Sequence, residues 1–165
     1  MPLPDEGSSL RGRFQQTFSV PEAAIDGNEH VNNLEYLRWM VAAAQAHSDA
    51  AGWTVERYAA TRSSWVVRSH HIDYLRPAFA GEVLTLVTWI GGFEETASTR
   101  HYLLWRERDR KVLAQAQTLW VFVEADTGRA CAIPDAFRSA FEVIPEGKAV
   151  LRALRQGLLT PHLTP

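Results

Sequence analysis

One long helical segment followed by four consecutive strand segments is the feature that most restricts the fold of this sequence. From Asn33 the apolar residues recur at helical spacing, and alanine, the best helix former, is frequent up to Gly52. Turn sequences then separate four segments rich in Val, Trp, Thr and Leu: SWVVRSHHIDYL, GEVLTLVTWI, STRHYLLWRER and KVLAQAQTLWVFVE. Their short connections predict antiparallel pairing.

A further strand precedes the helix, because RFQQTFSV alternates apolar and polar residues and stops at Pro21. One helix and five antiparallel strands predict an α+β fold in two layers. We expect a strongly curved five-stranded sheet wrapped around one long central helix, with the helix across its concave face. The alanines let the sheet approach closely.

The flanking segments complete the predicted domain organisation. Residues 1–10 contain Pro, Gly and Ser with little to bury, which is typical of a flexible tail. The domain itself is predicted over residues 11–142, including short helices in TVERYAA, capped by Thr54, and in IPDAFRSAF. Residues 143–165 form a C-terminal extension whose pattern allows one more short helix, with Val150, Leu151, Leu154 and Leu158 on one face.

Composition and charge exclude several classes of protein. Hydrophobic residues make up 46% of the 165 residues, enough for the core of one domain. The net charge of −2 gives no general basic excess, which argues against nucleic acid as a partner. The single Cys131 suits a reducing compartment. There is no secretory signal pattern and no apolar run near the ~20 residues that span a bilayer, so we expect a soluble, cytoplasmic protein.

The stretch IDGNEHVNN places several polar residues directly before the buried helix. Polar groups near a core need partners, so this run requires an explanation. Asp26-Gly27-Asn28 is a good turn sequence by itself, and Asn32 and Asn33 are good helix caps. From these residues alone a structural role and a functional role both stay open.

The pattern D-x-N-x-H-V-N-N-x-x-Y followed by LRW resembles the start of the central helix in hotdog-fold acyl thioesterases. These include 4-hydroxybenzoyl-CoA thioesterase-like proteins, bacterial acyl-CoA thioesterases and plant acyl-ACP thioesterases. HIDYLRPAFAGEVLTLVTWI and AIPDAF resemble later parts of the same family, so the resemblance spans about residues 12–142. It implies hydrolysis of an acyl-CoA or, as a less favoured carrier, an acyl-ACP thioester. It also implies a homodimer, which can pair into a dimer of dimers, with the site at the subunit interface, no metal, and no cofactor beyond the carrier thiol.

At the catalytic positions, the sequence matches one branch of the family and departs from another. The catalytic Asp of the 4-hydroxybenzoyl-CoA branch corresponds to Ala24 here, whereas the Asp, Asn and His of the plant branch correspond to Asp26, Asn28 and His30. Asp26 is therefore the expected catalytic acid, acting on water or on the thioester carbonyl, with Asn28 and His30 as positioning groups.

The start of the central helix is expected to supply the oxyanion donors. A helix N-terminus offers free backbone N–H groups and a partial positive charge. The N–H groups of Val31, Asn32 and Asn33 are the predicted donors, and Tyr36 lines the acyl pocket or belongs to the ordinary core. Six arginines, Arg100 among them, are candidates for the phosphates of the carrier, and the sequence does not select one.

Other interpretations remain beside the thioesterase. The missing acid at Ala24 allows a non-catalytic acyl- or thioester-binding hotdog protein, and hotdog hydratases or dehydratases also place Asp and His near the helix. Glu35 is expected to be a solvated residue of the first helical turn. The pair His70-His71 is not expected to bind a metal, because adjacent strand residues point to opposite faces. His47 is expected to be a satisfied core histidine.

Overall fold

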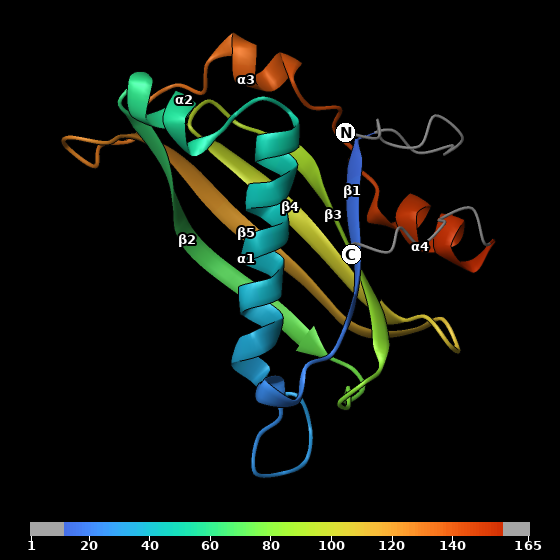
Figure 1. The fold of residues 1–165 in the computed structure, drawn as a ribbon. Helices are drawn as coiled ribbons and strands as arrows, with labels where there is room; N and C mark the ends of the chain where they lie inside the picture. The colour runs from blue at the N-terminus through green and yellow to red at the C-terminus, as the bar shows by residue number, and fades with distance from the viewer. Residues whose placement is uncertain (1–11, 157–165) are drawn as a thin grey trace.

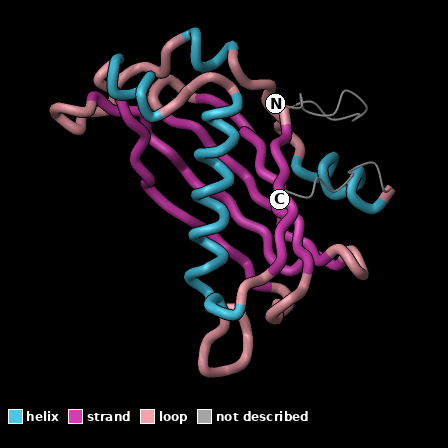
Figure 2. Tube along the Cα trace, in the orientation of Figure 1, coloured by secondary structure: helices cyan, strands magenta, loops and turns pink. Residues whose placement is uncertain are grey.

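A long helix crosses one face of a five-stranded antiparallel sheet in the computed structural model, which describes residues 12–156 (Figure 1). The strands lie in the order β1-β3-β4-β5-β2, so β1 and β2 are the edges (Figure 2). The strands are β1 (Arg13–Ser19), β2 (Ser63–Tyr74), β3 (Val83–Phe93), β4 (Ala97–Arg106) and β5 (Lys111–Glu124). The helices are the 3-10 turn η1 (Glu22–Ala24), α1 (Asn33–Ala50), α2 (Val55–Ala60), α3 (Asp135–Ser139) and α4 (Gly147–Arg155).

Helix α1 begins and ends at the residues that its sequence favours. The side chain of Asn32 accepts a hydrogen bond from the Leu34 N–H at 2.9 Å, which makes Asn32 the N-cap. After the last turn, Gly52 adopts a φ of +86°, which a residue without a Cβ tolerates best. The buried side of α1 carries Tyr36, Met40, Ala43 and Ala44, so small side chains let the sheet approach closely.

The sheet is covered on both faces at its centre, which explains the almost unbroken burial of β3. On one face, Leu86 of β3 and Leu104 of β4 pack in the same cluster as Met40 of α1. On the other face, Trp89 and Trp105 pack with Val150, Ala153 and Leu154 of α4. The C-terminal helix therefore covers the face of the sheet opposite the central helix (Figure 1).

Strand β2 pairs with β5 on one side only, and its other edge is not paired within residues 12–156. Val66 is 45% exposed and Val67 is 40% exposed, although both are large apolar residues in the middle of the strand. The pairing with β5 shifts between Val67 and Ser69, as in a β-bulge. An open edge with exposed apolar side chains is a surface on which another strand can add.

The predicted architecture is confirmed: one strand, the long helix and then four strands form a curved sheet around the helix. The short helices predicted in TVERYAA, IPDAFRSAF and the C-terminal segment are present as α2, α3 and α4. The predicted tail at residues 1–10 lies outside the described residues, as does Leu158 of the C-terminal pattern. No helix in the described part of the chain is both long and apolar enough to cross a membrane.

Candidate functional site

The loop between η1 and α1 is a compact turn built by its own backbone. The Asp26 N–H donates to the His30 carbonyl at 2.8 Å, and the Glu29 N–H donates to the Asp26 carbonyl at 3.1 Å. The carboxylate oxygen Oδ1 of Asp26 accepts from the Asn28 N–H at 2.9 Å. Glu29 takes a φ of +64° at the tip. The local sequence therefore forms the turn that Asp-Gly-Asn favours, and Asp26 is part of it.

The predicted catalytic residues share this loop but are not hydrogen-bonded to one another through their side chains in the described part of the chain. Asp26 is partly buried, and its second carboxylate oxygen has no hydrogen bond to a described residue. Asn28 and His30 are exposed, and the ring of His30 stands edge-on to Phe79 with 5.4 Å between ring centroids. The loop thus presents an acid, an amide and an imidazole to solvent beside the start of α1.

Of the three predicted oxyanion donors, two are already engaged within the fold. The Val31 N–H donates to the Ala78 carbonyl at 3.0 Å, and the Asn32 N–H donates to the Ala24 carbonyl at 2.8 Å. Asn33 is the first residue of α1, and its N–H has no acceptor among residues 12–156. The free donor at the positive end of the helix is therefore the Asn33 amide.

Tyr36 lies in the core, where it is 3% exposed, and lines neither cavity described here. Its ring meets Tyr74 of β2 edge-on at 5.1 Å, and burial raises the pKa of its hydroxyl. The Tyr74 hydroxyl donates to the Asn33 carbonyl at 3.2 Å. These contacts tie the last residue of β2 to the start of α1.

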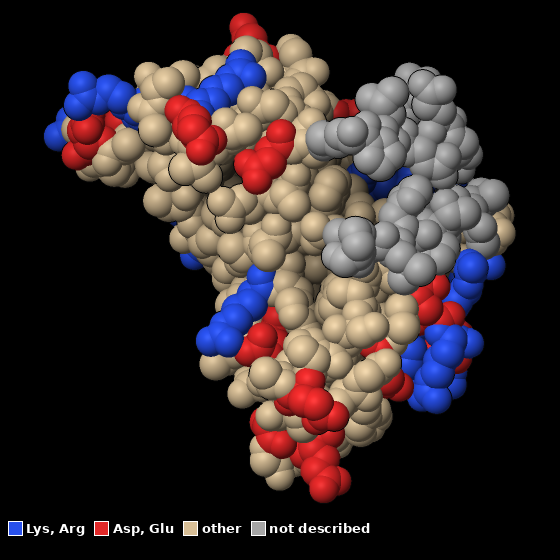
Figure 3. Space-filling model, in the orientation of Figure 1, with Lys and Arg blue, Asp and Glu red and all other residues tan. Residues whose placement is uncertain are grey.

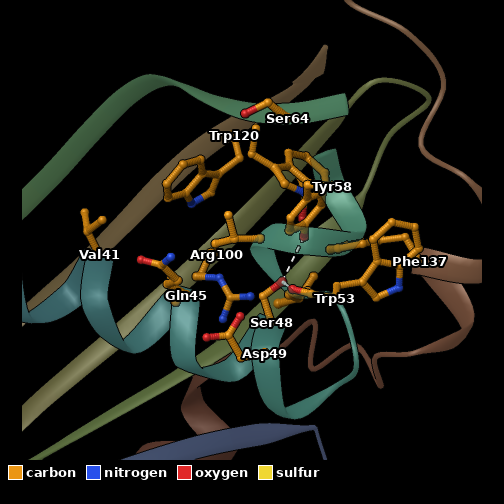
Figure 4. Close-up of a pocket in the computed structure, with 15 residues that line it drawn as sticks. Val41, Gln45, Ser48, Asp49, Trp53, Tyr58, Ser64, Arg100, Trp120 and Phe137 are labelled. Atoms are coloured by element: carbon orange, nitrogen blue, oxygen red, sulfur yellow. Dashed lines mark hydrogen bonds between the residues drawn. The ribbon is translucent and has the colours of Figure 1, made fainter. Parts of the chain in front are cut away.

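A cavity of about 280 Å³ lies at the other end of α1, between the helix and strands β2, β4 and β5 (Figure 4). Apolar and aromatic side chains form most of its wall, and Gln45, Ser48 and Arg100 are among the polar ones. The remaining lining residues are Val41, Ala44, Asp49, Trp53, Val55, Tyr58, Ser64, Trp65, Ile90, Ser98, Trp120 and Phe137. A second cavity, of about 300 Å³, lies beside α4 on the opposite face of the sheet.

Arg100 is a buried cation in the wall of the first cavity, only 6% exposed. Its Nη1 donates to Nδ1 of His47 at 2.9 Å and to Oγ1 of Thr88 at 3.1 Å. Burial lowers the pKa of Arg100. Burial and the neighbouring Arg100 cation lower the pKa of His47 to about 3, so His47 is neutral and accepts the hydrogen bond.

Arg100 is the functional candidate that sequence reasoning did not single out. From the sequence alone it is one of six candidate arginines, but β4 alternates: Tyr102 and Leu104 pack toward α1, whereas Leu103 and Trp105 pack toward α4. The same alternation places Arg100 on the side of α1. The spacing along β4 is therefore the sequence signal that distinguishes Arg100 from the other arginines. His47, in contrast, is the satisfied core histidine that was predicted.

The other predicted surface features have structural partners. Glu35 pairs with Arg38 at 2.5 Å on the first turns of α1. His70 hydrogen-bonds Thr118 at 2.7 Å, whereas His71 faces Asp73 at 3.2 Å. Among the described residues no three His, Cys, Asp or Glu side chains gather as a metal site would require. The loop before α1 carries acids but neither Lys nor Arg, and acidic side chains gather over this end of the molecule in Figure 3.

Comparison with known proteins identifies the family of this fold. The family model of the thioesterase-like superfamily matches residues 20–141. The chain is 26% identical over 132 residues to the long-chain acyl-CoA thioesterase FadM of Escherichia coli, covering 78% of this chain and 97% of that protein. It is 24% identical over 135 residues to a chloroplastic palmitoyl-acyl carrier protein thioesterase of Gossypium hirsutum, which covers 78% of this chain. The chain spans only 33% of the length of that plant protein.

Solved structures share the same architecture. A Staphylococcus aureus protein in complex with CoA superposes with a TM-score of 0.75 at 18% identity, covering 81% of this chain and 84% of that one. The 1,4-dihydroxy-2-naphthoyl-CoA thioesterase of Synechocystis superposes with a TM-score of 0.72 at 19% identity, covering 78% and 95%. The chain belongs to the thioesterase-like superfamily. Its predicted hotdog fold and family are both confirmed.

Proposed function

We propose that the protein is an acyl thioesterase that hydrolyses an acyl-CoA, or an acyl-ACP, to the free acid and the thiol. The observation that carries the proposal is the position of Asp26, Asn28 and His30 in the loop that leads directly into the N-terminus of α1. The family match and the named activities of FadM and the plant relative support the same reaction. The single free Cys131 supports a reducing, cytoplasmic setting.

The loop and the helix start supply the groups that thioester hydrolysis needs. The unbonded carboxylate oxygen of Asp26 activates water or attacks the thioester carbonyl, and Asn28 and His30 position the reacting groups. The Asn33 N–H, at the positive end of α1, donates to the oxygen that becomes negative. One such donor contributes about 10²–10³ in rate. The reaction needs no cofactor beyond the CoA or phosphopantetheine that the substrate carries.

The first cavity, which we take as the acyl site, lies far from the reacting groups of the same copy. The lining residue of α1 nearest to the helix start is Val41, which lies about 12 Å along the helix axis from Asn33 at 1.5 Å per residue. Most of the lining lies farther along α1, so a short acyl group bound beside Arg100 does not present its thioester to Asp26 of the same copy. A second copy can bring the two parts together.

Pairing of β2 with β2 of a second copy would bring the cavity of one copy close to the helix start of the other. Antiparallel pairing about a two-fold axis between Arg68 and Ser69 sets Ser63 of one copy opposite Tyr74 of the other. Tyr74 is bonded to the start of α1, and Ser64 and Trp65 line the cavity. The helix start of each copy then lies beside the cavity of the other. The open edge of β2 and the exposed Val66 and Val67 support this homodimer; a dimer of dimers would need a further contact.

A thiol-release assay with a panel of acyl-CoA thioesters and an acyl-ACP tests the proposed reaction. We expect turnover by the wild type and a loss of about 10²–10⁴ in kcat for Asp26→Asn, since the amide neither activates water nor attacks. Glu29→Gln, which neutralises a neighbouring acid at the tip of the same loop, is the matched control and keeps its activity. Full activity in Asp26→Asn would remove Asp26 from the mechanism.

A binding protein without catalysis is the second candidate, because one oxygen of Asp26 is held in the turn and Ala24 replaces the other acid of the family pattern. Tight binding of acyl-CoA without thiol release would favour this candidate over the enzyme.

A further inference from the structure

The cavity beside α1 contains a cation, Arg100, that has no anionic partner among the described residues. Arg100 donates hydrogen bonds to His47 and Thr88, and both come from Nη1. Its Nε and Nη2 have no acceptor in the described part of the chain. Both acceptors are uncharged, because the pKa of His47 is about 3. No ion pair joins Arg100 to Asp49 or to any other described acid. Asp49 lines the cavity but is an exposed residue.

A buried guanidinium is expensive to keep unless a negative group pairs with it. A purely structural link between β4 and α1 would need only a neutral donor to reach His47. The arginine instead brings a fork of N–H donors that matches a carboxylate in two parallel hydrogen bonds. Figure 4 shows Arg100 with Gln45, Ser48 and Asp49 at the cavity.

The other residues of the cavity wall indicate what kind of ligand would bring a negative group to Arg100. Trp53, Trp65 and Trp120 line the cavity with Ile90 and Phe137, and the indole nitrogen of Trp53 is buried without an acceptor among the described residues. An apolar chain fits such walls, but a chain with an apolar end would leave the guanidinium unpaired. A chain that ends in an acceptor satisfies both the walls and the cation.

We propose that Arg100 binds a carboxylate at the far end of the acyl group, so that the substrate class is the thioesters of dicarboxylic acids. The proposal rests on the acyl thioesterase function proposed above and narrows its substrate. In the homodimer, the thioester lies at the helix start of one copy, and the terminal carboxylate reaches Arg100 in the cavity of the other.

Suberoyl-CoA and octanoyl-CoA test the proposal, because they have the same number of carbons and differ in the terminal carboxylate. We expect the wild type to favour suberoyl-CoA in kcat/KM. Arg100→Met should lower kcat/KM for suberoyl-CoA about 10- to 100-fold, the range for hydrogen bonds to a charged group, and leave octanoyl-CoA little changed. Arg100→Lys keeps the charge without the fork and should fall between them. Arg129→Met, which removes an exposed cation, is the matched control.

An equal loss for both thioesters in Arg100→Met, or a wild type that favours octanoyl-CoA, would overturn the proposal. Replacement of a buried charge by an apolar residue is often tolerated, and the melting temperature of each variant shows whether it folds.

Binding of the free acids tests carboxylate recognition by Arg100 independently of thioester hydrolysis. Suberate should raise the melting temperature of the wild type and not that of Arg100→Met, whether or not any thioester turns over. Stabilisation by suberate with no hydrolysis would refute the proposed enzyme and keep the ligand chemistry of Arg100. Arg100-dependent stabilisation by octanoate, without a preference for suberoyl-CoA, would overturn the substrate class and identify a free acid as the ligand. No stabilisation by either acid, together with no preference, would also overturn it.

Discussion

Asp26 shows how one side chain can be structural and available for chemistry at once. Its Oδ1 completes the turn with the Asn28 N–H, which fixes the orientation of the carboxylate, whereas the other oxygen is not bonded to a described residue. A carboxylate held in this way loses little freedom when a reacting group arrives. The two interpretations that the sequence left open for Asp-Gly-Asn are therefore compatible.

His47 makes the stability of the fold depend on pH. Its folded pKa of about 3 lies below the ordinary value of 6.5, because burial and the Arg100 cation disfavour the charged ring. Below pH 6.5 the unfolded chain takes up a proton that the folded chain refuses, so stability falls as the pH falls. At about pH 5 the loss from this residue is on the order of 2 kcal/mol.

Urea unfolding at neutral and acidic pH measures this effect. His47→Gln keeps an acceptor for Arg100 and does not titrate, so its stability should fall less steeply with acid than that of the wild type. Burial also lowers the pKa of His70 and His101, so the stability of the variant should still depend on pH to some extent. The same substitution at the exposed His71 gives the comparison variant. Identical slopes in His47→Gln and the wild type would contradict the account.

At the scale of the elements, the N-terminus of α1 is held from both sides. The Asn32 side chain caps the helix, while the Val31 and Asn32 amides are bonded to Ala78 and Ala24. Only Asn33 keeps a free N–H among the described residues at this point. The helix start is rigid where the proposed reaction needs a fixed donor.

Asn32→Ala tests the cap. Loss of the side-chain acceptor for the Leu34 N–H should destabilise the protein by about 1 kcal/mol, measured by chemical unfolding. Asn32→Asp retains an acceptor and should retain most of the stability. An unchanged free energy of unfolding in Asn32→Ala would show that the backbone contacts alone hold the helix start.

Local sequence pattern predicted the helices and strands well, because hydrophobic periodicity and turn-forming residues depend only on residues that are close in the sequence. The strand before Pro21, the helix that begins at Asn33 and the Thr54 cap of α2 all appear in the structure. The hydrogen bond from the Val31 N–H could not be predicted, because its acceptor, the Ala78 carbonyl, lies far away in the sequence. The cavity also could not be predicted from local pattern, because its wall combines residues of three helices, α1, α2 and α3, with residues of strands β2, β3, β4 and β5.

At the scale of the whole molecule, the sheet ends in an apolar edge that a second copy would cover. Val66→Glu combined with Val67→Glu should shift the protein from dimer to monomer in sedimentation experiments, because paired β2 strands would bury two like charges from each copy. Thioesterase activity should fall with the dimer. Val83→Glu, at another exposed valine of the sheet, is the control and should stay dimeric. A monomeric wild type would contradict the composite site.

Complementation between two inactive variants tests most directly the claim that the site is shared by two copies. Asp26→Asn removes the acid and keeps the cavity, whereas Ala44→Trp fills the cavity and keeps the acid. If random pairing on co-expression makes half of the dimers mixed, and each mixed dimer has one intact site, activity should recover to about a quarter of the wild type. Mixed dimers that are as inactive as either variant alone would contradict the account, because acid and cavity would then have to act within one copy.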